Sequence, residues 1–219
     1  MKLLPTAVIT GLLAAAVAVS GQAADNISKV YGGITVESGQ TAGKVNTVNG
    51  SIKLETGARA GAVETVNGSI RLERNAQAAS VESVNGAIRL AEGAQLSGDL
   101  ETVNGAITLA QGARVDGDLE NVNGTITLDA ATIGGRLSTV NGSLLIGANS
   151  HIGGGIKVGK PGGFSLSRRL TRVVIGPGAR VDGELVFERE VDLHVHEDAV
   201  IGPVQGASAQ RYSGQSPED

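Results

Sequence analysis

The sequence predicts an all-β protein, a parallel β-solenoid of about nine triangular coils, each of 18–19 residues. Three observations predict this fold. The tripeptide Val-Asn-Gly returns at a nearly constant spacing, the apolar runs between turns are too short for helices, and Val, Ile and Thr in those runs favour strands. Aromatic residues make up only 2% of the chain and cysteine is absent. The core must therefore consist of aliphatic side chains in many thin, similar layers.

Residues 1–23 differ in character from the rest of the chain. Lys2 precedes the apolar run "TAVITGLLAAAVAV", and small residues stand at Gly21 and Ala23. This order is typical of a secretory signal peptide cleaved before Ala24, and the run is shorter than the roughly 20 residues that a membrane span needs. We therefore expect an exported protein in the periplasm, at the cell surface or secreted, with no transmembrane span after cleavage.

The charge balance narrows the range of partners. Without residues 1–23 the chain keeps 17 basic against 22 acidic residues, a net charge of −5. A mildly acidic protein is a poor match for nucleic acid or for an anionic membrane surface. Because it has no cysteine, the exported chain must fold in an oxidising compartment on packing alone.

The repeat is marked by asparagines that precede glycine at spacings of 18 or 19 residues. They are Asn49, Asn67, Asn85, Asn104, Asn123 and Asn141. An earlier copy, "YGGITV", puts Tyr31 in the asparagine position. Each Val-Asn-Gly is expected to form one corner of the triangle, with glycine at positive φ and asparagine tolerating the left-handed region. Stacked at roughly 4.8 Å, the amides should form a buried, structural hydrogen-bonded ladder.

The repeat predicts a solenoid over residues 24–204, followed by a flexible polar tail at 205–219. A loop insertion at 159–172, "GKPGGFSLSRRLTR", interrupts the pattern before "VVIGPGARVDGELVF" resumes it. Loops that break a regular scaffold often carry binding sites. The candidate interaction residues in this loop are Phe164, Arg168, Arg169 and Arg172.

Two groups of bacterial proteins contain similar motifs. The stretches "IGPGARVDGEL" and "GARVDGDL" resemble the repeats of bactofilins, and "TVNGSIRL" resembles adhesin-like β-solenoid domains of the bacterial envelope. The resemblance to bactofilins implies a triangular, right-handed coil that self-associates end to end. The chain departs from that family in its signal peptide, its Val-Asn-Gly corner and its loop insertion. "IGPGAR" is also similar to left-handed hexapeptide transferases, but a strict six-residue period fails elsewhere.

Two charged columns are predicted on either side of the Val-Asn-Gly corner, where they should partly compensate each other. The position three residues before the asparagine gives Glu64, Glu82, Glu101 and Glu120, and the position four residues after it gives Lys53, Arg71 and Arg89. A solvated charged face is the default interpretation of such columns. Calcium or a cationic polymer bound to the glutamates is the functional alternative.

One segment resembles a metal-ligand set. In the strand "EVDLHVHED", alternation places Asp192, His194 and His196 on one face. A His-x-His pair with a neighbouring carboxylate can bind zinc or a similar metal. The other interpretation is an exposed polar strand near the end of the solenoid.

No motif in the chain predicts catalysis, and no cofactor is expected. Polysaccharide-cleaving β-helices use sugar-stacking aromatics, whereas this chain has two Tyr, two Phe and no Trp. The leading hypothesis is a non-enzymatic envelope scaffold or adhesin-like surface that binds an envelope protein or polymer, as a monomer or small homo-oligomer. The alternatives are a head-to-tail polymer-forming protein, and a metal- or glycan-binding module or weak enzyme that uses the last coil.

Overall fold

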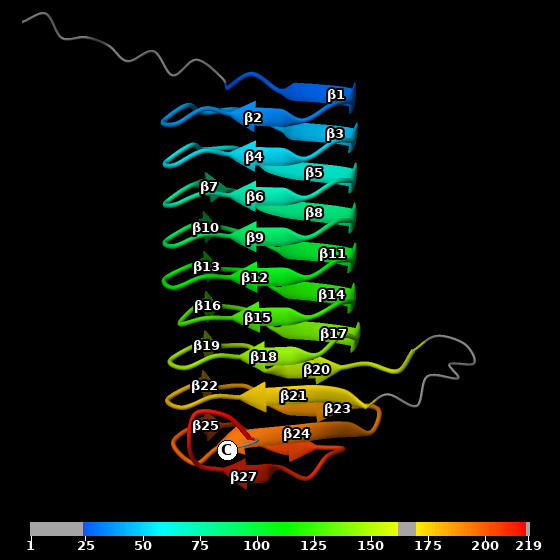
Figure 1. The fold of residues 1–219 in the computed structure, drawn as a ribbon, viewed down its shortest axis with the longest axis vertical. Coiled ribbons are helices and arrows are strands. Elements are labelled where there is room, and N and C mark those ends of the chain that lie inside the picture. The colour runs from blue at the N-terminus through cyan, green and yellow to red at the C-terminus, as the bar shows by residue number, and fades with distance from the viewer. Residues whose placement is uncertain (1–23, 162–169, 218–219) are drawn as a thin grey trace, which may run out of the picture.

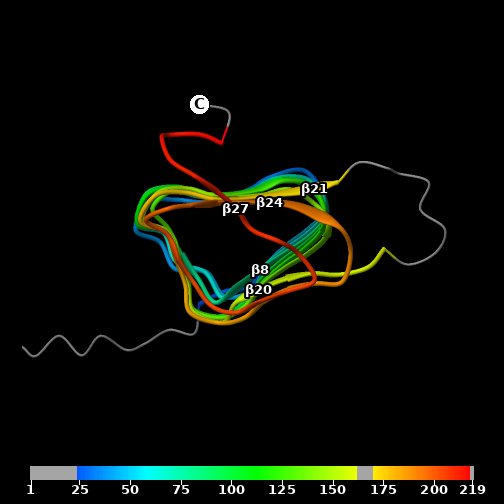
Figure 2. The same cartoon turned by 90° about the horizontal axis from the view of Figure 1, so that it is seen from below.

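The computed structural model describes residues 24–161 and 170–217. These residues form a parallel β-solenoid of about nine turns with no helix (Figure 1). Seen along its axis the solenoid is a triangle whose sides are three sheets (Figure 2). The chain passes from β1 (Ile27–Tyr31) at the back to β2 (Ile34–Val36) at the front, running leftward as it descends. The coil is therefore right-handed, as the sequence predicts.

Each strand pairs in parallel with the equivalent strand of the neighbouring coil, on both sides within a sheet and on one side at its ends. Sheet A contains β1, β3 (Val45–Asn49), β5 (Ala62–Asn67), β8 (Ser80–Asn85), β11 (Leu100–Asn104), β14 (Leu119–Asn123), β17 (Leu137–Asn141), β20 (Ile156–Val158), β23 (Leu185–Phe187) and β26 (Val204–Gln205). Sheet B contains β2, β4 (Ile52–Leu54), β6 (Ile70–Leu72), β9 (Ile88–Leu90), β12 (Ile107–Leu109), β15 (Ile126–Leu128), β18 (Leu144–Ile146), β21 (Thr171–Ile175), β24 (Val191–His196) and β27 (Gln210–Tyr212). Sheet C contains β7 (Gln77–Ala78), β10 (Gln95–Leu96), β13 (Arg114–Val115), β16 (Thr132–Ile133), β19 (His151–Ile152), β22 (Arg180–Val181) and β25 (Val200–Ile201).

The core is a stack of aliphatic layers inside the triangle. In one coil, Leu100 on sheet A, Ile107 and Leu109 on sheet B, and Val115 on sheet C are all fully buried. Because side chains alternate along each short strand, a coil directs only a few large residues inward. Burying such a side chain stabilises the fold by about 1.5–3 kcal/mol. The repetition of this layer confirms the predicted aliphatic core.

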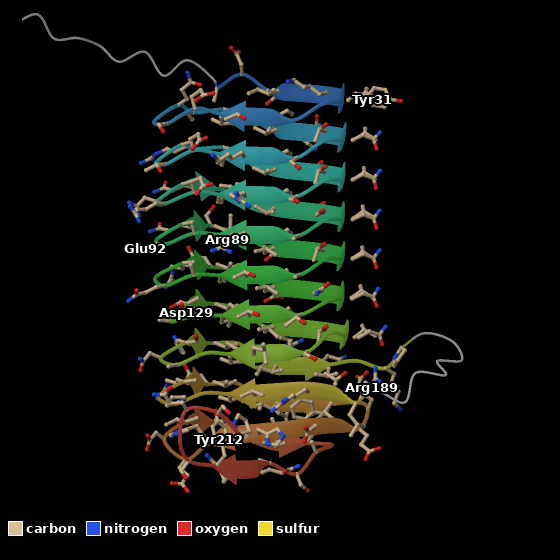
Figure 3. All side chains as sticks on the ribbon, viewed as in Figure 1. Tyr31, Arg89, Glu92, Asp129, Arg189 and Tyr212 are labelled. Carbon is tan, nitrogen blue, oxygen red and sulfur yellow. The ribbon has the colours of Figure 1, made fainter. Side chains whose placement is uncertain are left out.

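The six asparagines form a continuous ladder along the corner between sheets A and B (Figure 3). Each Nδ2 donates to the Oδ1 of the preceding asparagine at 2.9–3.1 Å, from Asn67 to Asn141. Tyr31 lies in register with Asn49 at one end, and Arg189 donates to Asn141 Oδ1 at 3.0 Å at the other. The amides project outward, and all but the half-buried Asn123 are exposed. The expectation of a buried ladder is therefore wrong.

The corner glycines have a different role from the predicted one. Apart from Gly124, with φ of 129°, none of them has positive φ. Instead, a Cβ on Gly105 would collide with the carbonyl oxygen of Gly86 on the preceding coil. Positive φ occurs at the turn between sheets B and C, for example at Gly57 (69°) and Asn75 (56°). Close stacking of coils, rather than left-handed backbone, thus requires glycine in Val-Asn-Gly.

Two predicted boundaries differ from the structure. The insertion leaves the solenoid at the corner between β20 and β21, but Thr171 and Arg172 already belong to β21, so it is shorter than 159–172. The predicted flexible tail at 205–219 is also wrong, because Gln205 lies in β26 and β27 adds a further strand to sheet B. The solenoid therefore continues to Tyr212. The predicted signal peptide lies outside the described residues.

Candidate functional site

A long groove on the outer face of sheet A is the candidate functional site. It has a volume of about 720 Å³ and extends over seven strands, from β1 to β17. Strand alternation explains its walls. In β11 Leu100 and Thr102 point into the core, whereas Glu101 and Val103 point outward and border the groove. Because every coil repeats this pattern in register, the walls are columns that run along the axis.

One wall is a stripe of exposed valines, namely the valines of the Val-Asn-Gly repeats. Five of them are 38–42% exposed: Val48, Val66, Val84, Val103 and Val122. Val30 extends the stripe at its first coil. Sequence reasoning treated these valines only as part of the repeat marker and missed this stripe. Strict alternation from the buried Leu100 would have placed Val103 outside, beside Glu101.

The opposite wall is the predicted glutamate column. Glu64, Glu82, Glu101 and Glu120 lie in register on adjacent strands. Glu64 pairs with Lys44 at 2.7 Å, but the other three form no ion pair with the described residues. Desolvation, followed by the nearby carboxylates of Glu82, Glu120 and Asp99, raises the pKa of Glu101. The column is therefore a row of carboxylates with incomplete compensation.

The predicted basic column does not neutralise these glutamates. It lies on sheet B, where Lys53, Arg71 and Arg89 are in register. Lys53 pairs instead with Glu55 at 2.7 Å and Glu73 at 3.7 Å. The expected compensation across the corner is wrong, because the exposed asparagine ladder separates the two columns.

The proposed metal site at Asp192, His194 and His196 does not form. His194 Nε2 lies 2.9 Å from Asp192 Oδ1, whereas His196 Nδ1 accepts a hydrogen bond from the backbone N–H of Asp198 at 3.1 Å. No group of three potential metal ligands converges within residues 24–161 and 170–217. Alternation fails at the end of β24, where Val195 and His196 are both buried. The structure therefore does not bring the three predicted ligands together, and metal binding here stays an untested prediction.

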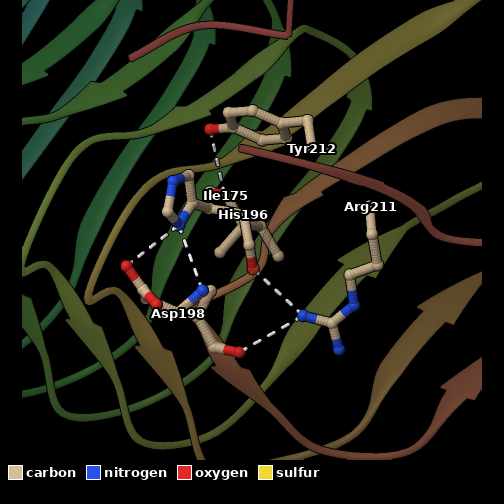
Figure 4. A network of polar contacts seen from close by, with 6 residues as sticks. Ile175, His196, Asp198, Arg211 and Tyr212 are labelled. Carbon is tan, nitrogen blue, oxygen red and sulfur yellow. Dashed lines mark hydrogen bonds and ion pairs between the residues drawn. The ribbon is translucent and has the colours of Figure 1, made fainter. Parts of the chain in front are cut away.

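His196 belongs instead to the closure of the solenoid (Figure 4). Its ring meets that of Tyr212 edge to face at 5.1 Å, and the Tyr212 hydroxyl donates to the Ile175 carbonyl at 3.3 Å. Arg211 follows the buried Val195 in register and donates to the His196 carbonyl at 3.0 Å. Arg211 thus follows Val195 in a column of side chains that point into the core. At this end of the core its guanidinium group donates hydrogen bonds to backbone carbonyl groups.

The candidate interaction loop is only partly visible. Phe164, Arg168 and Arg169 lie outside the described residues, whereas Arg172 lies in β21 in register with Asp192. Sequence reasoning also missed a contact between coils on sheet C, where His151 Nε2 lies 2.7 Å from a carboxylate oxygen of Asp182. The insertion separates these residues by 31 positions, so the 18-residue spacing does not reveal them.

The fold and the groove define this chain as a parallel β-solenoid repeat protein with a long groove on the outer face of sheet A. No family model, curated protein or solved structure matches the chain. None of the described residues belongs to a helix that is long and apolar enough to cross a membrane.

Proposed function

We propose that this protein is an exported, non-enzymatic scaffold of the bacterial envelope, and that the sheet A groove is its interaction surface. One observation carries the proposal. The valine stripe exposes stacked apolar side chains over successive coils, in a groove that extends along seven strands. Contiguous exposed apolar surface of this kind marks interaction sites in soluble proteins. The resemblance to adhesin-like envelope domains supports the same role.

The construction of the groove also supports binding. Its walls stand on paired strands above a fully buried aliphatic core. Side chains on such a scaffold lose little conformational freedom when a partner binds, which lowers the entropic cost of association. A groove repeated coil by coil suits an elongated partner, such as an extended segment or a linear polymer of the envelope.

The test is co-sedimentation of the purified protein with cell envelopes of the producing organism. The groove variant carries Val84→Lys and Val103→Lys, two outward positions that the core does not use. Its matched control carries Thr108→Lys and Leu145→Lys on the outward face of sheet B. Both variants add the same charge to exposed surface. We expect the wild type and the control to sediment with the envelopes, and the groove variant to remain in solution.

Two outcomes would contradict the proposal. Equal loss in both variants would mean that net charge, rather than the groove, governs association. No sedimentation of the wild type would remove the interaction function altogether. Export is checked separately by mass spectrometry of the chain recovered outside the cytoplasm, which should begin at Ala24.

The alternative function, a head-to-tail polymer, requires two open ends. At the N-terminal end β1 and β2 are edge strands, and Val30 and Tyr31 are 60% and 78% exposed. Such edges can pair with another chain. At the other end Arg211 and Tyr212 close the core. This asymmetry favours monomers, or dimers through the N-terminal end, over filaments.

A further inference from the structure

We propose that the sheet A groove binds a linear polyamine whose nitrogens are separated by three carbons. The proposal rests on the function given above, in which this groove is the binding face. It identifies the chemical class of the occupant from the two walls. The glutamate column calls for several positive charges, and the valine stripe calls for an aliphatic chain between them.

The spacing of the charges selects the spacer. Glu64, Glu82, Glu101 and Glu120 occupy consecutive coils, and successive coils in a parallel sheet are about 4.8 Å apart. In an extended chain with bonds of about 1.5 Å and angles near 111°, two nitrogens separated by three carbons lie about 5 Å apart. Separation by four carbons gives about 6.2 Å on the same bond lengths. Only the shorter spacer stays in step with the column over several coils.

The groove width suits a single aliphatic chain. Glu101 and Val103 are two residues apart on one strand, so their Cβ atoms are about 7 Å apart. A chain lying between these walls places its methylene groups against the valine methyls and its ammonium groups against the carboxylates. Each methylene group removed from water adds to the affinity through the hydrophobic effect. Desolvation and then the neighbouring carboxylates raise the pKa of Glu101, and each bound ammonium relieves the second of these two causes.

Three other occupants fit the groove less well. A second copy of this chain would bring its glutamate column against this one, and like charges in apposition oppose docking. An extended cationic peptide repeats its side chains on one face about every 6.6 Å, which falls out of step with the coils. An α-helix is about 10–12 Å across with its side chains, too wide to enter between the two columns.

The experiment is calorimetric titration of the protein at pH 7 and low salt. The probe is the tetraamine with three-carbon spacers throughout, and the comparison is the tetraamine with four-carbon spacers. We expect one molecule of the probe per groove, with an affinity at least about threefold higher than that of the comparison, because mismatch accumulates over three spacers. Tetralysine, with equal charge on a peptide backbone, should bind more weakly than the probe.

Three variants separate the two walls. Glu82→Gln with Glu101→Gln should weaken probe binding about tenfold or more, since two charge pairs are lost. Val84→Ser with Val103→Ser should weaken it about threefold or more and leave the salt dependence unchanged. The control, Glu73→Gln with Glu92→Gln, removes the same charge outside the groove and should bind like the wild type. Urea denaturation of each variant establishes that it is folded.

Several results would overturn the proposal. These are equal affinity for the two tetraamines, tighter binding of tetralysine, an unaffected valine variant, or no heat at millimolar probe. Calcium could also bind the same glutamates more tightly than the probe and displace it. That result would mean that the column binds metal ions rather than a polyamine. Envelope co-sedimentation by the same groove would survive any of these results. Failure of this inference is therefore distinguishable from failure of the proposed function.

Discussion

At the scale of single residues, the asparagine and glycine at the corner of each coil act through contacts with the coils stacked next to them. Asn104 donates to Asn85 and accepts from Asn123, both across coils. Gly105 allows its coil to approach Gly86, where a methyl group would collide with a carbonyl oxygen. Neither role is local, because both depend on the equivalent residue of a neighbouring coil. The same dipeptide in an isolated strand pair would form a two-residue hairpin turn.

Replacing Asn104 with Ala should lower the free energy of unfolding by about 1 kcal/mol. The substitution removes two side-chain hydrogen bonds, but the amides are exposed and water replaces part of each bond. Asn49→Ala is the matched control, because this end of the ladder accepts only from Asn67 and should cost about half as much. Urea denaturation of both variants is the measurement. An unchanged midpoint for Asn104→Ala would show that the ladder adds no stability.

At the scale of elements, each outward position of a strand becomes a column with one chemical character. The glutamate column is an energetic liability, because unit charges about 4.8 Å apart repel by roughly 0.9 kcal/mol even in water. Within the part of the chain that the structure describes, Glu64 is the one member of the column with an ion-pair partner, Lys44. Elsewhere on the solenoid Lys157 and Glu188 form an ion pair between coils. The groove instead carries a row of glutamates in register, three of which have no ion-pair partner among the described residues.

Glu101→Gln should stabilise the protein at neutral pH, by up to about 1 kcal/mol after screening by water and salt. The pKa of Glu101 is raised in the folded state, so the folded protein binds this proton more tightly than the unfolded chain does. The ionised carboxylate accordingly costs stability, and this cost grows as the pH rises above about 4.3, the ordinary pKa of glutamate.

The measurement is the urea midpoint of Glu101→Gln and of the wild type between pH 3 and 8. The advantage of the variant should be present at neutral pH and vanish below about pH 4, where both states carry a neutral side chain. Glu92→Gln serves as the control, because Glu92 is exposed and faces Arg74 at 3.3 Å. It should show no gain at neutral pH. A pH-independent difference for Glu101→Gln would exclude the electrostatic explanation.

At the scale of the whole molecule, the two ends of the solenoid differ. The N-terminal end presents β1 and β2 as edges of sheets A and B. The last coils are closed by β27, with Arg211 bound to the His196 carbonyl and Tyr212 packed on the His196 ring. A parallel solenoid offers the same backbone pairing at every coil, so only its ends decide whether copies of the chain can stack.

Removal of the closing strands should therefore change the assembly state. We expect the complete protein to be a monomer, or a dimer through its N-terminal end, in light scattering and negative-stain microscopy at neutral pH. A chain that ends at Pro203 lacks β26 and β27, so β23 and β24 become the terminal strands of sheets A and B and Arg211 and Tyr212 no longer cover the end of the core. This chain should form end-to-end chains or fibres. Abundant fibres from the complete protein, or none from the shortened one, would contradict the role assigned to β27.

The sequence by itself determines the repeat, the triangular coil, the aliphatic core and the columns of this protein. These features follow from spacing and alternation, and every coil repeats the signal, as with Asn104 and Glu101. The tertiary structure decides those contacts that do not recur with the 18–19-residue repeat. The buried ring of His196 packs on Tyr212, a residue of the segment predicted to be a flexible tail, so His196 does not converge with Asp192 and His194. Val103 is likewise exposed beside Glu101 because the other face of β11 packs against the core. Which face packs inward is fixed by the packing of all three sheets around the core, and this orientation forms the groove.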